Sequence, residues 1–186
     1  MLSRPTFNDT PEMLKRVIQL KPMGIAQHGG TTNRFWDAGQ FDRSLDYLKR
    51  IRDTGAMVGL SCHNPREVEY AEEKGWDVDY YQTCLYRVSR TAEEARAEFK
   101  EAPVGETYME KDPERMCKMI RQTKKPCLAF KLFGAGRTIG SRQQVEAAFR
   151  FAFANIKPTD PVIVGMFPRF SDQVGENIGI VRGLLA

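Results

Sequence analysis

Short apolar runs alternate along this chain with longer segments in which apolar residues recur every three or four positions. The runs are continuous rather than alternating apolar and polar, which is typical of strands buried on both faces of a parallel sheet. The longer segments have the spacing of amphipathic helices. The pattern predicts an α/β fold of about five parallel βα units. The predicted strands are residues 23–27, 57–60, 78–86, 126–133 and 161–165.

Helix boundaries follow from local capping signals. Asn64 is followed by Pro65 and by Glu67, which predicts a capped helix directly after the second strand. Similar pairs predict helix starts at Thr91 with Glu94 and at Ser141 with Gln144, while Ser171 is expected to cap the last helix. Residues 1–9 are predicted to be irregular, a helix is expected to start at Thr10, and residues 31–40 are predicted to form a loop.

The order of these elements favours part of an eightfold α/β barrel of the TIM type. A helix precedes the first strand and another follows the last, yet a complete barrel needs about 250 residues and eight strands. The 186 residues of this chain are some three units short. We therefore expect residues 1–186 to form a single partial barrel domain, truncated at the N-terminus, which represents the C-terminal portion of a longer barrel. A smaller open sheet is the alternative.

Composition restricts the cellular location and the binding partners that the chain can have. With 41% hydrophobic and 28% charged residues the chain is typical of a globular protein, and it contains no apolar run as long as a membrane span. The N-terminus lacks the apolar core of a signal peptide, and the four cysteines show no metal-type pairing, so a cytoplasmic location is expected. The net charge of +4 is spread over mixed helices, which favours a solvated surface over nucleic-acid binding.

Polar residues gather where the predicted strands end, and in parallel α/β proteins this edge carries the chemistry. Both histidines of the chain, His28 and His63, fall at such ends. Imidazole titrates near neutrality and suits proton transfer or metal ligation, although each ring could also satisfy a local backbone group. Lys131 interrupts an apolar run, so we expect it to face the mouth of the barrel or an anion there. The Gly-rich turn 134–137 fits a phosphate cradle and a simple tight turn equally well.

Several sequence segments resemble the aldo-keto reductases. They are the segment 45–63 ending in G-L-S-C-H, the segment 78–82 ending in glutamine, A-F-K-L-F-G at 129–134, and the closing strand followed by Q-V-G-E-N at 173–177. The similarity extends from about residue 23 to the C-terminus and corresponds to the family's fourth strand onward. That family is an eightfold α/β barrel that usually binds NADP(H) and reduces carbonyl groups.

The resemblance implies roles for individual residues. His28 falls where the family orients its substrate, and Phe130 falls where an aromatic ring stacks on the nicotinamide. The carboxamide of the nicotinamide would be held by residues at the second and third strand ends, and the rest of the cofactor by residues further on. The implied cofactor-binding residues are Ser61, His63, Asn64, Gln82, Phe130, Lys131, Arg169, Gln173 and Asn177.

The departures from the family change the expected activity. The family's catalytic aspartate, tyrosine and lysine lie on earlier strands. We therefore expect only the complete barrel to reduce the carbonyl group of a small-molecule substrate with NADP or NAD. This chain alone is expected to be inactive. Two other functions remain open: a metal-dependent hydrolase or isomerase using His28 and His63, and a non-catalytic barrel. Open sheet edges would also allow self-association.

Overall fold

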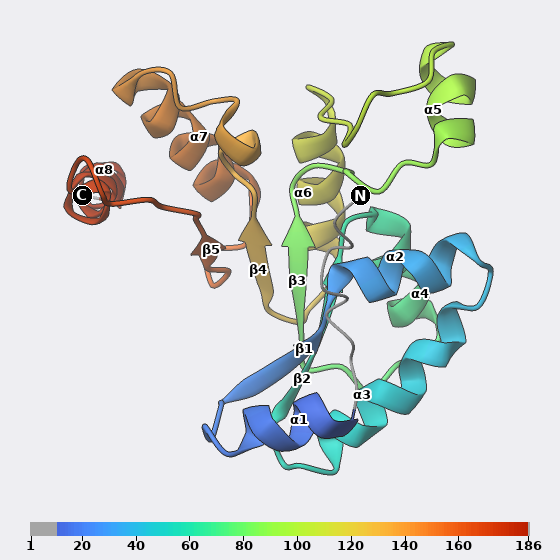
Figure 1. The fold of residues 1–186 in the computed structure, drawn as a ribbon. Helices are drawn as coiled ribbons and strands as arrows, with labels where there is room; N and C mark the ends of the chain where they lie inside the picture. Colours follow the sequence, from blue (N-terminus) through green and yellow to red (C-terminus); the bar gives the residue numbers. More distant parts are fainter. Residues whose placement is uncertain (1–10, 186) are drawn as a thin grey trace.

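The computed structural model describes residues 11–185, in which five strands alternate with helices (Figure 1). The strands are β1 (Gly24–Gln27), β2 (Met57–Cys62), β3 (Tyr80–Cys84), β4 (Cys127–Phe130) and β5 (Val162–Ile163). The helices are α1 (Pro11–Ile18), α2 (Gly29–Asp37), α3 (Ser44–Arg52), α4 (Pro65–Glu73), α5 (Ala92–Phe99), α6 (Asp112–Gln122), α7 (Arg142–Asn155) and α8 (Gln173–Leu185), with 3₁₀ turns η1 (Phe41–Arg43) and η2 (Gly134–Gly136). The predictions for residues 1–9 and for Thr10 fall outside the described residues.

The five strands form one sheet in the order β1-β2-β3-β4-β5, and every neighbouring pair is parallel. This confirms the predicted α/β fold with five parallel strands alternating with helices. The sheet is not closed, because β1 and β5 lie at its opposite edges. Its strong twist is visible in Figure 1, where β1 and β2 cross below β3 and β4. Because all strands are parallel, their carboxyl ends lie together at one end of the sheet.

Helices cover one face of the sheet and form the core with it. Val58, Leu60 and Cys62 of β2 alternate with the residues on the opposite face, and all three are fully buried. Helix α3 packs against β1 and β2, while α4 lies against β2 and α6 against β3. Helix α6 also contacts α7, and α7 contacts α8. Burial of this apolar face provides most of the driving force for folding.

The opposite face of the sheet carries small and aromatic residues. The ladder register places Gly59 beside Tyr80, and the tyrosine ring lies over the glycine. A Cβ atom at Gly59 would come within 2.3 Å of the ring carbon Cζ of Tyr80, so this position has no room for a side chain. Further toward the carboxyl ends, the same face presents Gln82 and Phe130, which are both half-buried.

The predicted loop over residues 31–40 is wrong, because residues Gly29–Asp37 form helix α2. The ring of His28 caps this helix: the backbone N–H of Gly30 donates to its Nδ1 at 3.1 Å. Thr32 adds a tertiary anchor, since the side chain of Gln27 donates to its hydroxyl at 3.2 Å. A histidine cap is an uncommon signal, and the paired glycines after it favour a turn in isolation.

Other element boundaries differ by a few residues. Strand β5 contains only Val162–Ile163, because it pairs with β4 alone at the edge of the sheet. Helix α8 begins at Gln173 rather than after Ser171, and Asp172 accepts a hydrogen bond from the backbone N–H of Gly175. The Asn64–Glu67 and Thr91–Glu94 capping boxes are confirmed. Within the described part of the chain no helix has the length and apolar character needed to cross a membrane.

Substituting Gly59 by alanine should destabilise the protein. The added methyl group would meet the ring of Tyr80, and this buried ring would have to shift to make room for it. Overpacking of this kind costs roughly 1–3 kcal/mol, measurable as a lower urea midpoint. Gly179→Ala is the control: its Cβ meets no atom within 4 Å and it lies inside α8, so the variant should be as stable as the parent or more stable. Equal midpoints for the two variants would contradict this packing.

Candidate functional site

The carboxyl ends of the first two strands meet at one edge of the sheet. Gly29, which follows His28, lies so close to β2 that a Cβ there would approach His63 Cε1 to 2.5 Å and Ser61 Oγ to 3.2 Å. The ring of His63 lies 5.8 Å from the ring of Phe130 at the end of β4. We call this group, together with Gln82 and Lys131, the strand-end site. The structure thus brings together the polar strand ends singled out in the sequence.

His63 is held as a neutral imidazole. Its Nδ1 lies 3.0 Å from Nδ2 and 3.2 Å from Oδ1 of Asn33 in α2, so the ring orientation is fixed whichever tautomer forms. Burial, followed by the charges of Lys131 and His28, lowers the pKa of His63 to about 4. The ring is therefore uncharged at neutral pH. Asn33 was not identified in the sequence, because it became a site residue only through the unexpected helix α2.

Lys131 connects the strand-end site to a loop that the sequence analysis left without a role. Its Nζ donates to Tyr108 Oη at 3.2 Å and lies 3.4 Å from Glu106 Oε2, while Tyr108 donates to the same carboxylate at 2.8 Å. Burial raises the pKa of Glu106, but the hydrogen bond from Tyr108 and the charge of Lys131 lower it to a net value below the usual range. The site therefore combines a phenol, an ammonium and a carboxylate.

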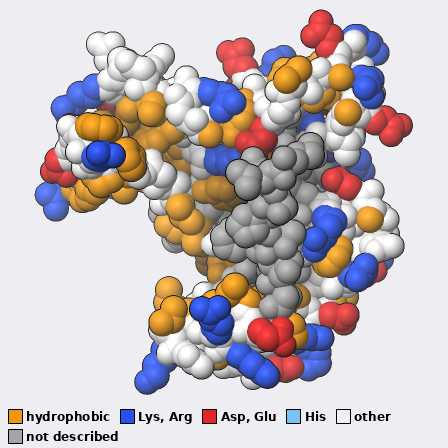
Figure 2. All heavy atoms as spheres, viewed as in Figure 1, with side chains coloured by type: hydrophobic (Ala, Val, Ile, Leu, Met, Phe, Trp, Pro, Cys, Tyr) orange, Lys and Arg blue, Asp and Glu red, His pale blue; other side chains and the backbone are white. Residues whose placement is uncertain are grey.

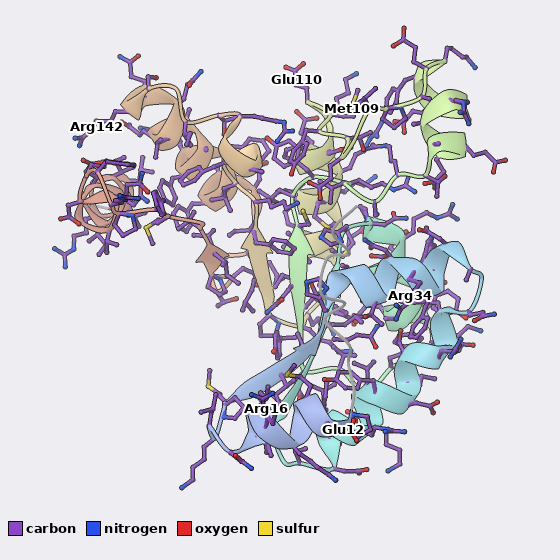
Figure 3. The ribbon with its side chains drawn as sticks, in the orientation of Figure 1. Glu12, Arg16, Arg34, Met109, Glu110 and Arg142 are labelled. Atoms are coloured by element: carbon purple, nitrogen blue, oxygen red, sulfur yellow. The ribbon has the colours of Figure 1, made fainter. Side chains whose placement is uncertain are left out.

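The Tyr108 ring is fixed by its neighbours. The guanidinium carbon of Arg137 lies 3.7 Å from the ring centroid, and the Tyr86 ring lies 5.2 Å away. The only sequence signal for this arrangement is an aromatic residue in a long loop. Figure 3 labels Met109 and Glu110, which mark where this loop reaches α6 above the carboxyl ends of β3 and β4.

The backbone of Lys131 has an unusual conformation. Its φ of +61° falls in the left-handed region, which a non-glycine residue adopts at a cost of roughly 1–3 kcal/mol. The strained position directly follows β4 and directs the strand into η2, where Gly134, Ala135 and Gly136 also have positive φ. Such strain is common at functional sites, and here it accompanies the contacts of Lys131 with the loop.

Two adjoining cavities extend from the strand-end site toward α8. The first, of about 450 Å³, is lined by Phe130 and Lys131 among others, and the second, of about 330 Å³, by Asn177 and Arg142. The two cavities share four of their lining residues, Phe133, Ile139, Gly165 and Gln173. The side chain of Gln173 is held in place because its Oε1 accepts from the backbone N–H of Phe167 at 2.7 Å. Figure 3 shows Arg142, the first residue of α7, near α8.

Other predicted site residues have local structural roles or lie elsewhere. The Asn64 side chain caps α4 by accepting from the backbone N–H of Arg66, and it is buried. His28 caps α2, as described above. Arg169 is exposed, packs beside Phe170 at 5.5 Å and lines neither cavity, whereas Arg142 does. The structure therefore offers Arg142 as a cation that lines the same cavity as Asn177.

The metal-site alternative gains no ligand set from the described residues. Between residues 11 and 185 no three His, Cys, Asp or Glu side chains come together in a way that could hold a metal ion. All four cysteines are free and buried. Any site built on His28 and His63 would therefore need further ligands from outside this range.

Comparisons with models of protein families, with curated proteins and with solved structures find no match for this chain.

The titration of His63 provides a direct test of this geometry. In NMR titrations its ring signals should shift with a midpoint near pH 4, far below the usual value of 6.5, because burial disfavours the imidazolium. Lys131→Met should raise the pKa of His63 part of the way from about 4 toward 6.5, because the substitution removes a positive charge but leaves the ring buried. The chain has two histidines, so a His28→Gln variant assigns the signals. A midpoint near 6.5 would show that the ring is not buried against Lys131.

Proposed function

We propose that this chain is the cofactor-binding part of an oxidoreductase of the aldo-keto reductase type, which uses NADP or NAD to reduce the carbonyl group of a small molecule. The sequence resemblance suggests the class, and the positions of the resembling residues support it. Five consecutive βα units with helices on one face of the sheet would then be five of the eight units of a barrel, with its interior on the Tyr80 face.

The observation that carries this proposal is the pair of adjoining cavities. They link Phe130 and Lys131 at the strand ends with Gln173 and Asn177 at the start of α8. Residues that the resemblance assigns to opposite ends of one cofactor thus line a single elongated depression. Figure 2 shows hydrophobic side chains gathered around α8 and the adjoining end of the sheet, as expected where a large organic ligand binds.

The residues present fit a nicotinamide cofactor. Ser61 and Gln82 are register neighbours in adjacent strands, and both can hydrogen-bond a carboxamide. Phe130 on the same face of the sheet is half-buried and lines the cavity, so it offers a ring for stacking. The bound cofactor would supply the hydride for the carbonyl carbon. Arg142 would neutralise a 2′-phosphate at the far end of the depression.

Tyr108 would be a proton donor for this chemistry within the chain itself. Its hydroxyl lies 3.2 Å from the Lys131 ammonium and donates to Glu106 at 2.8 Å. Burial and the hydrogen bond to Glu106 raise the pKa of Tyr108, and Lys131 opposes them, so the hydroxyl would have to turn from Glu106 to the substrate to give up its proton. A phenolate formed by donating the proton to a carbonyl oxygen would be stabilised by Lys131 and by Arg137 above the ring. Neutral His63, whose ring lies 5.8 Å from that of Phe130, would help to orient the carbonyl.

Cofactor titration tests the proposal. Calorimetry should detect weak binding of NADPH and NADH, and Gln82→Ala should weaken both by a few-fold to about tenfold, the effect of one lost hydrogen bond. Arg142→Gln should weaken NADPH by roughly tenfold and leave NADH unchanged, because only NADPH carries the 2′-phosphate. Arg169→Gln, which removes an equal charge outside both cavities, is the matched control.

Three outcomes of this titration would count against the proposal in different ways. If neither cofactor binds at millimolar concentration, a barrel with another ligand becomes the better description. If Arg169→Gln selectively weakens NADPH, the sequence-based assignment of the 2′-phosphate is right and the cavity-based assignment is wrong. Stoichiometric zinc that is lost on His28→Ala or His63→Ala would instead favour the hydrolase alternative.

The open edges of the sheet should promote self-association, as a partial barrel implies. Beyond β1 and β5 the chain exposes large apolar side chains, including Met23 and Phe170, which are both 84% exposed. Sedimentation velocity should show oligomers that increase with protein concentration. Met23→Lys combined with Phe170→Lys should shift the population toward monomer, whereas Gln19→Lys combined with Gln122→Lys, the same charge change at exposed polar positions, should not. A monodisperse monomer at every concentration would contradict this.

A further inference from the structure

We propose that a third cavity, beside His63 and separate from the cofactor depression, binds a phosphate group. It lies between the start of α4 and the start of α6 and has a volume of about 190 Å³. Its lining consists of His63, Asn64, Pro65, Arg66, Leu85, Arg87, Arg90, Asp112, Arg115 and Met116. Four of these residues are arginines and one is a carboxylate. The inference goes beyond the proposed function, because the site needs no nicotinamide cofactor.

The base of this arginine cavity is a rigid ion pair. Arg90 and Asp112 have side chains only 1% exposed, and they pair through two hydrogen bonds, of 2.6 and 2.8 Å. Arg90 also donates through Nε to Glu98 at 2.9 Å and through Nη1 to the backbone oxygen of Arg87 at 3.0 Å. Its donors are therefore occupied, and its role is to hold the cavity in shape.

The other three arginines have donors left for a ligand. Arg66 is exposed and forms no ion pair with any described residue. Arg115 forms ion pairs through Nη1 with Glu98 at 2.9 Å and with Asp112 at 3.6 Å, so its Nε and Nη2 are the nitrogens left for a ligand. Arg87 pairs with Glu94 through Nη2, and its buried Nε has no hydrogen-bond partner. A buried donor without a partner is uncommon and is explained if an anion accepts from it.

Two helix N-termini add to the attraction for an anion. The first residues of α4 and of α6 both line the cavity, and the helix dipole places partial positive charge there. The start of α4 is already capped by Asn64, whereas α6 has no side-chain capping bond at Lys111. His63 contributes no charge, since its pKa is about 4, so the arginines dominate. Guanidinium groups bind phosphate through paired hydrogen bonds, which makes phosphate the oxyanion that this lining fits best.

His63 lies on the wall of this cavity and also belongs to the strand-end site. A ligand whose phosphate fills the arginine cavity would therefore lie beside the imidazole that also belongs to the strand-end site. The chemical class that fits is a small phosphorylated compound, with free phosphate as the minimal ligand.

Calorimetric titration with inorganic phosphate and with glycerol phosphate tests this inference. The wild-type chain should bind phosphate saturably with one site, at constant ionic strength. Arg66→Gln and Arg115→Gln should each weaken binding roughly tenfold. Arg66 has no ion pair to lose, so its variant should keep the parental melting curve; a melting curve of Arg115→Gln checks the folding of the second variant. Arg16→Gln removes the same charge from α1, at the opposite end of the sheet (Figure 3), and should leave binding unchanged.

Each outcome supports or overturns the site. Tighter binding of glycerol phosphate than of phosphate supports an organic phosphate as ligand, and equal or weaker binding supports the free ion. Absence of saturable binding, or an equal loss with Arg16→Gln, overturns the proposal and leaves general charge attraction. Because neither probe contains nicotinamide, failure of cofactor binding would not affect the result.

Discussion

The structure depends on strand β2 being paired on both sides and covered on both faces. It exchanges ladder hydrogen bonds with β1 and β3, and five of its six residues are buried. Such a strand is mostly apolar, and it needs a residue without a side chain where a large ring from the next strand crosses it; Gly59 of β2 leaves this room for Tyr80 of β3. Because its partners are parallel, β2 sets the direction of the sheet and places His63 at the same edge as the ends of the other strands.

The turn from β2 into α4 places a carboxyl group in the core. Glu67 is fully buried, and its Oε2 accepts the backbone N–H groups of His63 and Asn64. Its Oε1 has no partner, and burial raises the pKa of the carboxyl to about 8, so it is mostly protonated at neutral pH. Glu67, the partner of Asn64 in the capping box, thus also holds the backbone of His63. The geometry of the strand-end site is therefore coupled to the packing of α4.

The strand-end site combines a rigid part with a part supplied by loops. Ser61 and Gln82 are fixed by ladder register, which any parallel sheet would impose. Glu106 and Tyr108, in contrast, reach Lys131 from the long segment between β3 and α6. That segment is anchored by the buried Arg90–Asp112 pair, which also forms the base of the arginine cavity. One ion pair therefore positions both the phenol and the cationic lining next to His63.

The sequence by itself determined the five parallel βα units, the caps at Asn64 and Thr91, and the gathering of His28, Ser61, His63 and Lys131 at the carboxyl ends of the strands. These follow from local periodicity, from capping chemistry and from the rule that parallel strands share an edge. Tertiary structure decided that residues 29–37 are helical, since the packing of α2 against β2 and the Asn33–His63 contact add to the His28 cap and outweigh the turn preference of two glycines. It also decided that Tyr108 meets Lys131 and that Arg142, unlike Arg169, lines a cavity. Contacts between residues far apart in the chain depend on loop paths and packing, which no local pattern specifies.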